Sequence, residues 1–155
     1  PGLERHMRGL LMLVAAVLAP LSAHAADWTK RSDDLTQQAS VLIQKEAYVD
    51  AVAALEAAIV ANPKNGRAFQ ALGRAYFGLG RYVQAQKYFL ISLEIDPTAA
   101  GALAYLGEID IYNEEIDAAA DKLGVLSRVC GAECAEYKKL SAAISEARSQ
   151  EGETR

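Results

Sequence analysis

The chain has few of the side chains that most enzymes use for acid–base and metal chemistry. Its 155 residues contain only two histidines and two cysteines. The histidines are His6 and His24, so no histidine follows position 24. A serine or cysteine nucleophile activated by histidine is therefore excluded beyond that point. Most zinc sites are excluded as well, because they need imidazole or four thiolates. We expect no enzyme, no catalytic residue, no metal site and no cofactor.

A basic surface is also missing. The chain has 16 lysines and arginines against 20 acidic residues, a formal net charge of -4, and its basic residues form no cluster. This balance argues against nucleic acid as a partner. Apolar residues make up 52% of the sequence, enough to build a core for one modest domain.

A hydrophobic run of membrane-spanning length is absent too, although a shorter run lies near the N-terminus. Basic residues at positions 5–8 precede the apolar run Leu10–Ala19, and Ala23-His24-Ala25 follows. This order is typical of a secretory signal peptide. We interpret residues 1–25 as a signal-peptide region, with translation starting at Met7 and cleavage near Ala25. This signal peptide would export the protein to the bacterial periplasm.

A retained membrane anchor is the alternative. It is weaker, because the apolar stretch falls short of the roughly 20 residues that span a bilayer. We expect contact with a membrane only if this leader remains uncleaved.

A period of 34 residues runs through the remaining chain. Ala51, Ala85 and Ala119 form one column at this interval. Several columns at one period indicate a repeat architecture. The other columns are Tyr48/Tyr82, Leu55/Phe89/Leu123, Ala58/Ser92/Leu126, Pro63/Pro97 and Leu72-Gly73/Leu106-Gly107.

The second unit has the pattern Phe69-x2-Leu72-Gly73-x2-Tyr76, then Ala85-x3-Phe89, then Pro97. This pattern resembles the tetratricopeptide repeat, a helix–turn–helix unit of about 34 residues. The resemblance implies an all-α fold, a right-handed α-solenoid of about three repeats with a C-terminal capping helix. We place the repeats at 32–65, 66–99 and 100–133 and the capping helix at 134–150. A linker over 26–31 and a disordered tail over 151–155 flank this domain.

One residue of the third unit departs from the family pattern. Asp110 stands where an aromatic residue is expected. Two hypotheses remain open: a polar contact to the next helix satisfies the carboxylate, or Asp110 faces the binding groove beside Glu108.

Cys130 and Cys134 lie where the third repeat meets the capping helix. In an exported chain, two cysteines this close predict a disulfide. A catalytic redox pair, a metal site and two reduced thiols are the alternatives.

The resemblance also implies that the first helix of each repeat lines a concave groove that binds protein segments. Arg67 and Arg74, seven residues apart, would project from one face toward an acidic group of the partner. The alternative is a solvated face in which Glu108 and Asp110 pair with these arginines. Chaperone-binding relatives hold a terminal carboxylate with lysine and asparagine, but the matching positions here are Thr36, Ser40 and Gly101. The predicted groove residues are Arg67, Gln70, Arg74, Phe77, Ala104, Glu108, Ile111, Tyr112 and Lys138.

From this resemblance we expect a non-enzymatic protein–protein interaction module, a scaffold or assembly adaptor of the cell envelope. The partner would be a protein or peptide segment. A membrane-tethered subunit of an envelope complex, with the leader retained, is the alternative function. A homo-oligomer also remains open.

Overall fold

The computed structural model describes residues 26–153, and all regular secondary structure within that range is helical. An N-terminal helix is described over residues 26–44. The helices that follow are α2 (Tyr48–Ala61), α3 (Gly66–Gly78), α4 (Tyr82–Ile95), α5 (Ala100–Tyr112), α6 (Ile116–Val129) and α7 (Ala135–Glu153). The predicted signal-peptide region, with Met7, lies outside the described residues.

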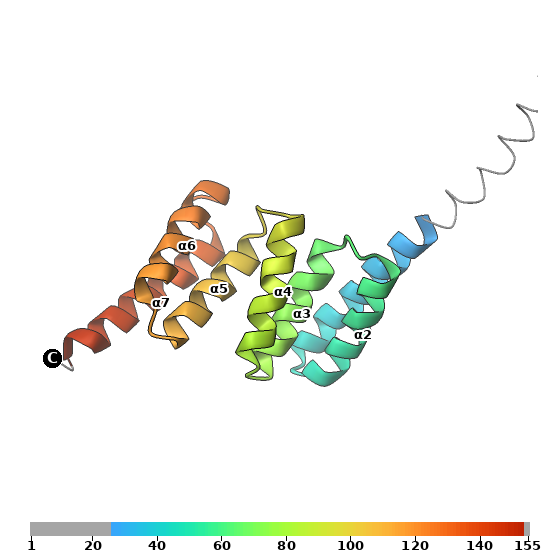
Figure 1. Ribbon diagram of the computed structural model, residues 1–155, viewed down its shortest axis with the longest axis horizontal. Helices are drawn as coiled ribbons and strands as arrows, with labels where there is room; N and C mark the ends of the chain where they lie inside the picture. Colours follow the sequence, from blue (N-terminus) through green and yellow to red (C-terminus); the bar gives the residue numbers. More distant parts are fainter. Residues whose placement is uncertain (1–25, 154–155) are drawn as a thin grey trace, which may run out of the picture.

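The helices stand side by side in an elongated row (Figure 1). Each helix from α2 to α7 packs on the next, and α3 also contacts α5 while α5 contacts α7. The first helices of successive repeats therefore touch each other directly. This arrangement confirms the predicted all-α solenoid of helix pairs.

The columns of the 34-residue period form the core. Ala51, Ala85 and Ala119 are fully buried where paired helices cross. Phe89 is also fully buried, and its ring leaves no space for a larger residue at Gly73, where an added Cβ would lie 2.6 Å from a ring carbon. Small residues at fixed intervals therefore allow the helices to approach closely.

The turns within the repeats share one backbone feature. Positions 46, 80 and 114 lie 34 residues apart, and all have positive φ, at 58°, 69° and 64°. Gly80 adopts this left-handed conformation without a steric penalty. Glu46 and Glu114 adopt it at some cost, because their Cβ atoms crowd the backbone.

The N-terminal boundary of the domain differs from the prediction. Residues 26–31, predicted as a linker, are helical. An ion pair between Lys30 and Asp34, one turn apart, supports this part of the helix. Ser32 is fully buried, and Thr36 donates a hydrogen bond to its carbonyl oxygen. The helix therefore continues without a break into the first repeat.

The C-terminal boundary differs as well, because α7 continues to Glu153 rather than ending near position 150. Within residues 26–153, none of the helices combines the length and the apolar character needed to cross a membrane.

Candidate partner-binding groove

One side of the solenoid carries a groove lined by the N-terminal helix, α3, α5 and α7. Four adjoining pockets of about 300, 410, 310 and 440 Å³ form it. Arg74 lines three of these pockets, so it stands at the centre of the groove. Only Tyr48 and Tyr82 come from second helices. The first helices of the repeats, together with α7, therefore build almost the whole surface.

Eight of the nine predicted groove residues line these pockets. Lys138 does not; it forms an ion pair with Glu133 at 2.8 Å instead. Its neighbour Lys139 lines two pockets. The reason is the helical register of α7, which turns Ala135, Lys139 and Ala143 to the groove at intervals of four residues. The predicted residues that the structure does bring together are Arg67, Gln70, Arg74, Phe77, Ala104, Glu108, Ile111 and Tyr112.

The N-terminal end of the groove is an ordered polar network. Arg67 Nη2 donates to Asp33 Oδ1 at 2.9 Å, and the two residues lie 34 positions apart. Arg67 therefore has an intramolecular partner, but it is neither Glu108 nor Asp110. Beside this pair, the buried Asn65 side chain donates to Ser32 Oγ at 2.8 Å and accepts from the Ala68 backbone N–H. Asn65 thus joins the N-terminal helix to the start of α3.

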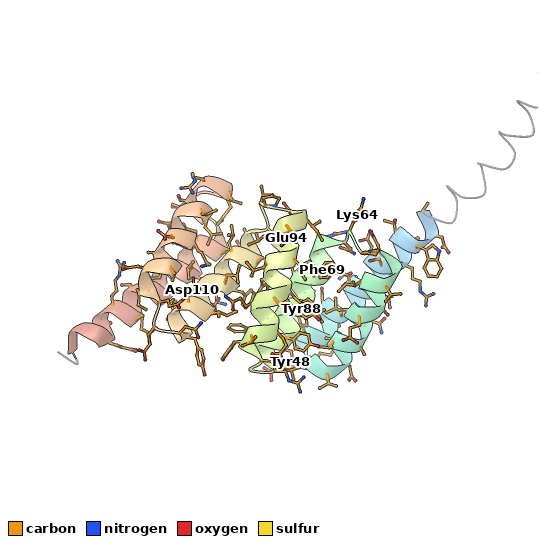
Figure 2. The ribbon with its side chains drawn as sticks, viewed as in Figure 1. Tyr48, Lys64, Phe69, Tyr88, Glu94 and Asp110 are labelled. Atoms are coloured by element: carbon orange, nitrogen blue, oxygen red, sulfur yellow. A yellow bond between two sulfur atoms is a disulfide. The ribbon has the colours of Figure 1, made fainter. Side chains whose placement is uncertain are left out.

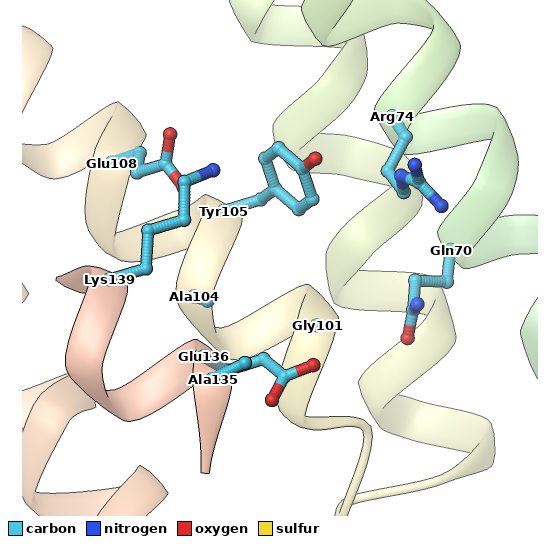
Figure 3. Close-up of a pocket in the computed structure, with 9 residues that line it drawn as sticks. All are labelled: Gln70, Arg74, Gly101, Ala104, Tyr105, Glu108, Ala135, Glu136 and Lys139. Atoms are coloured by element: carbon cyan, nitrogen blue, oxygen red, sulfur yellow. The ribbon is translucent and has the colours of Figure 1, made fainter. Parts of the chain in front are cut away.

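The middle of the groove contains a cation without a partner. Arg74 Nε is buried, and no acceptor for it lies in the part of the chain that the structure describes. No ion pair to Arg74 occurs there either. Figure 3 shows Arg74 and Gln70 on α3, across the pocket from Lys139 and Glu136 on α7, with the small residues of α5 between them.

Lys139 and Glu108 form an ion pair on the α5–α7 side of this pocket. Lys139 Nζ lies 2.9 Å from Glu108 Oε1 and 4.9 Å from the centroid of the Tyr105 ring. Glu108 Oε1 lacks a well-directed hydrogen bond, but the adjacent ammonium compensates its charge. Burial alone would lower the pKa of Lys139; the close contact with the Glu108 carboxylate and its negative charge outweigh burial and raise that pKa. Lys139 therefore stays charged, but its charge is already paired with that of Glu108.

The C-terminal end of the groove is aromatic. Phe77 contacts the edges or faces of Tyr82 and Tyr105, with ring centroids 5.2 and 5.0 Å apart. Tyr112 extends the cluster, since its ring centroid lies 4.4 Å from that of Tyr82. Together with Ile111 these rings border a pocket of about 310 Å³. This end of the groove is suited to an apolar side chain.

Asp110 belongs to the core rather than to the groove. It is buried, and Lys122 Nζ on α6 donates a hydrogen bond to its carboxylate. Figure 2 labels Asp110 on α5, within the helical body. The hypothesis of a polar contact to the next helix is confirmed, and the hypothesis that Asp110 faces the groove is wrong.

The two cysteines lie in the loop between α6 and α7. Their sulfur atoms are within bonding distance, and their Cα atoms are 5.8 Å apart. The carboxylate of Glu136 lies within 4.8 Å of both sulfurs. Bonded sulfurs cannot act as thiolate ligands, so this cluster does not suit a metal.

Sequence reasoning missed Lys139, Tyr82, Tyr105 and Glu136 as groove residues. Tyr82 belongs to one of the 34-residue columns, which marked it as structural but did not show that its ring borders the groove. Lys139 and Glu136 depend on how α7 packs against α5, which the 34-residue period does not fix.

Comparison with known proteins agrees with this geometry. Residues 42–91 match the tetratricopeptide repeat family model. The mouse superkiller complex protein 3 is 33% identical over 87 residues, which are 56% of this chain but only 5% of that protein. The chain thus spans a small fraction of that relative.

Solved structures share the fold. The TPR2B domain of yeast Sti1, in complex with pHsp70, superposes with a TM-score of 0.70 at 17% identity, covering 79% of this chain and 99% of that one. The Yersinia enterocolitica type III secretion chaperone SycD, in complex with a peptide of the translocator YopD, gives a TM-score of 0.65 at 21% identity, covering 79% and 94%.

The fold and its groove define a helical-repeat protein of the kind that presents a concave surface. The family match places tetratricopeptide repeat sequence at residues 42–91, and the shared architecture shows that the chain has the fold of tetratricopeptide repeat domains.

Proposed function

We propose that this protein is an interaction module that binds a segment of a partner protein in its groove and acts as a scaffold or assembly adaptor. The observation that carries the proposal is Arg74, a cation at the centre of the groove whose Nε is buried without an acceptor among residues 26–153. A buried polar group without a partner is costly, and a bound segment would relieve that cost.

Two structural neighbours support this proposal. SycD is in complex with a YopD peptide, and Sti1 TPR2B is in complex with pHsp70. Recognition of chaperone tails is not proposed here, because Thr36, Ser40 and Gly101 offer neither a lysine nor an asparagine at the clamp positions.

The proposed role is non-enzymatic. Glu108 and Asp110, two acidic residues close together on α5, are each held by a lysine of a following helix. Loss of a catalytic activity on replacing Glu108 would overturn this part of the proposal.

The proposed location is the cell envelope, with the leader cleaved and the protein in the periplasm. The support is the basic, apolar and small-residue order of residues 5–25. A membrane-tethered subunit with the leader retained is the alternative. N-terminal sequencing of the native protein decides between them, since a start at Ala26 excludes the tether and a start at Met7 supports it.

The groove is tested by crosslinking the tagged full chain in its own host and identifying the proteins that are recovered. The test variant is Arg67→Glu/Arg74→Glu, which reverses both groove charges. Arg81→Glu is the matched control, because Arg81 is exposed and lines none of the four pockets.

We expect a specific protein that the wild-type chain and the Arg81 variant recover and that the groove variant loses. Recovery of the same protein by all three would move the interface away from the groove, to the outer face of the solenoid. Recovery of nothing but the chain itself would favour a homo-oligomer over an adaptor.

A further inference from the structure

We infer that the partner segment carries a carboxylate side chain that docks on Arg74 and, a few residues away, a large apolar side chain that fills the aromatic end of the groove. This inference rests on the proposed function and names the chemistry of the segment that the groove selects. It concerns a side-chain carboxylate within the segment and does not require a free chain terminus.

The pairing of charges in the groove singles out Arg74. Arg67 is paired with Asp33 at 2.9 Å, and Lys139 is paired with Glu108 at the same distance. Arg74 therefore remains as the one groove arginine or lysine without an ion pair among residues 26–153. A guanidinium offers a planar fork of donors that matches a carboxylate, so an Asp or Glu side chain is its best partner.

Arg74 is not matched by an acceptor across the pocket. Glu136, on the opposite wall, also has no ion pair within the described residues. It is half-buried, however, and its oxygens are not among the buried atoms that lack a partner. Arg74 Nε, in contrast, is a buried donor without a hydrogen-bond partner, so a ligand in this pocket should supply a hydrogen-bond acceptor.

The aromatic end of the groove is suited to an apolar side chain of the partner. Tyr112 is 65% exposed, although its ring packs against Tyr82. Phe77 and Ile111 complete a pocket whose wall is mainly apolar. A side chain such as Leu, Met or Phe would remove this surface from water, at roughly 25 cal/mol for each Å² buried.

The helices set the spacing between the two subsites. Arg74 and Phe77 are three residues apart on α3, a rise of about 4.5 Å. An extended segment advances about 3.3 Å per residue. The acidic and apolar residues of the partner should therefore lie one to three positions apart.

Selection from a phage-displayed library of random twelve-residue peptides tests this inference. The full chain is used as bait, beside the variants Arg74→Gln and Tyr112→Ser. Both positions are at least partly exposed, and circular dichroism with thermal melting confirms that each variant is folded. Arg81→Gln is the matched control.

We expect wild-type and Arg81→Gln baits to enrich peptides with Asp or Glu one to three positions from a large apolar residue. Arg74→Gln should lose the acidic preference and keep the apolar one, while Tyr112→Ser should do the reverse. A selected peptide should bind Arg74→Gln at least about tenfold more weakly, as expected for a lost charge-assisted hydrogen bond.

Enriched peptides without an acidic residue, or an acidic preference that survives Arg74→Gln, would overturn the inference and leave the proposed function intact. Enrichment of no peptide by any bait would contradict the inference and also count against the groove as a site for linear segments. In that case, a partner whose crosslinking to the chain is lost in the Arg74 variant would support the proposed function, although the inference about the chemistry of the segment had failed.

Discussion

At Gly73 the crossing of α3 and α4 leaves no room even for a methyl group. An added Cβ would lie 2.6 and 2.7 Å from two carbons of the Phe89 ring, which is fully buried and cannot move aside. We expect Gly73→Ala to lower the free energy of unfolding by about 1–3 kcal/mol through overpacking. Urea denaturation measures this change.

Gly124 supplies the matched control. It lies inside α6, and the nearest atom to an added Cβ is the end of the Arg128 side chain at 4.0 Å. Gly124→Ala should therefore raise the free energy of unfolding by up to about 1 kcal/mol, the gain in helix propensity. Equal effects of the two substitutions would show that close contact at Gly73 is not what constrains that position.

The pair Asp110–Lys122 is the second residue-scale test. The Asp110 side chain is 6% exposed and that of Lys122 26%. Because removing one partner leaves the other charge in a poorly solvated site, Asp110→Ala and Lys122→Met should each cost about 2–4 kcal/mol of stability.

A double-mutant cycle separates this interaction from loss of packing. The double variant should lose less than the sum of the single variants by at least about 1 kcal/mol. Additive losses in urea unfolding would mean that the ion pair contributes nothing specific.

At the scale of helices, Asn65 fixes how the N-terminal helix meets α3. Its side chain accepts from the Ala68 N–H at 3.1 Å and donates to Ser32 Oγ at 2.8 Å. Asn65→Ala removes the cap of α3 and leaves the buried Ser32 hydroxyl without this donor, so we expect a loss of about 2 kcal/mol. Asn62→Ala is the control, because within the described part of the chain that side chain accepts only from the exposed Lys64 N–H. It should change stability by less than about 0.5 kcal/mol.

The Asn65 contact also predicts which part of the chain loosens. Hydrogen exchange in Asn65→Ala should rise first in the N-terminal helix, while α5 and α6 keep their protection. Uniform acceleration along the chain would contradict a local role for Asn65.

The bond between Cys130 and Cys134 joins α6 to α7 through a short loop. Closing a loop of this size stabilises the folded chain by about 2 kcal/mol in the chain-entropy account. Reduction should therefore lower Tm by roughly 4–8 °C. The Cys130→Ser/Cys134→Ser variant should melt at the reduced value and show no response to reductant; an unchanged Tm on reduction would show that the bond does not constrain the unfolded chain.

At the scale of the whole molecule, the sequence predicts the fold best at the helix crossings, where the same small residue type recurs in each repeat. The alanine column at 51, 85 and 119 and the left-handed Gly80 follow directly from packing and backbone geometry, so the repeat architecture could be predicted. The groove positions in α3 and α5 could also be placed, because the resemblance to the tetratricopeptide repeat assigns them within each unit.

The features that could not be predicted depend on contacts between repeats. Arg67 pairs with Asp33 of the preceding unit, and Lys139 rather than Lys138 faces the groove. Both depend on the angles at which helices pack, and the sequence carries no signal for those angles. The helical residues 26–31 differ in this respect, because the sequence does carry a signal for them: no glycine or proline separates them from the first repeat.

The groove, rather than the outer face of the solenoid, is the surface proposed to bind a partner segment. The most direct test of this proposal is the amide NMR spectrum of the labelled full chain, recorded as the partner segment mapped by crosslinking is added. If the segment binds in the groove, we expect shifts at Gln70, Arg74, Tyr105 and Lys139 and on the groove side of the N-terminal helix. Shifts confined to α2, α4 and α6, with the amides around Arg74 unmoved, would contradict the proposal.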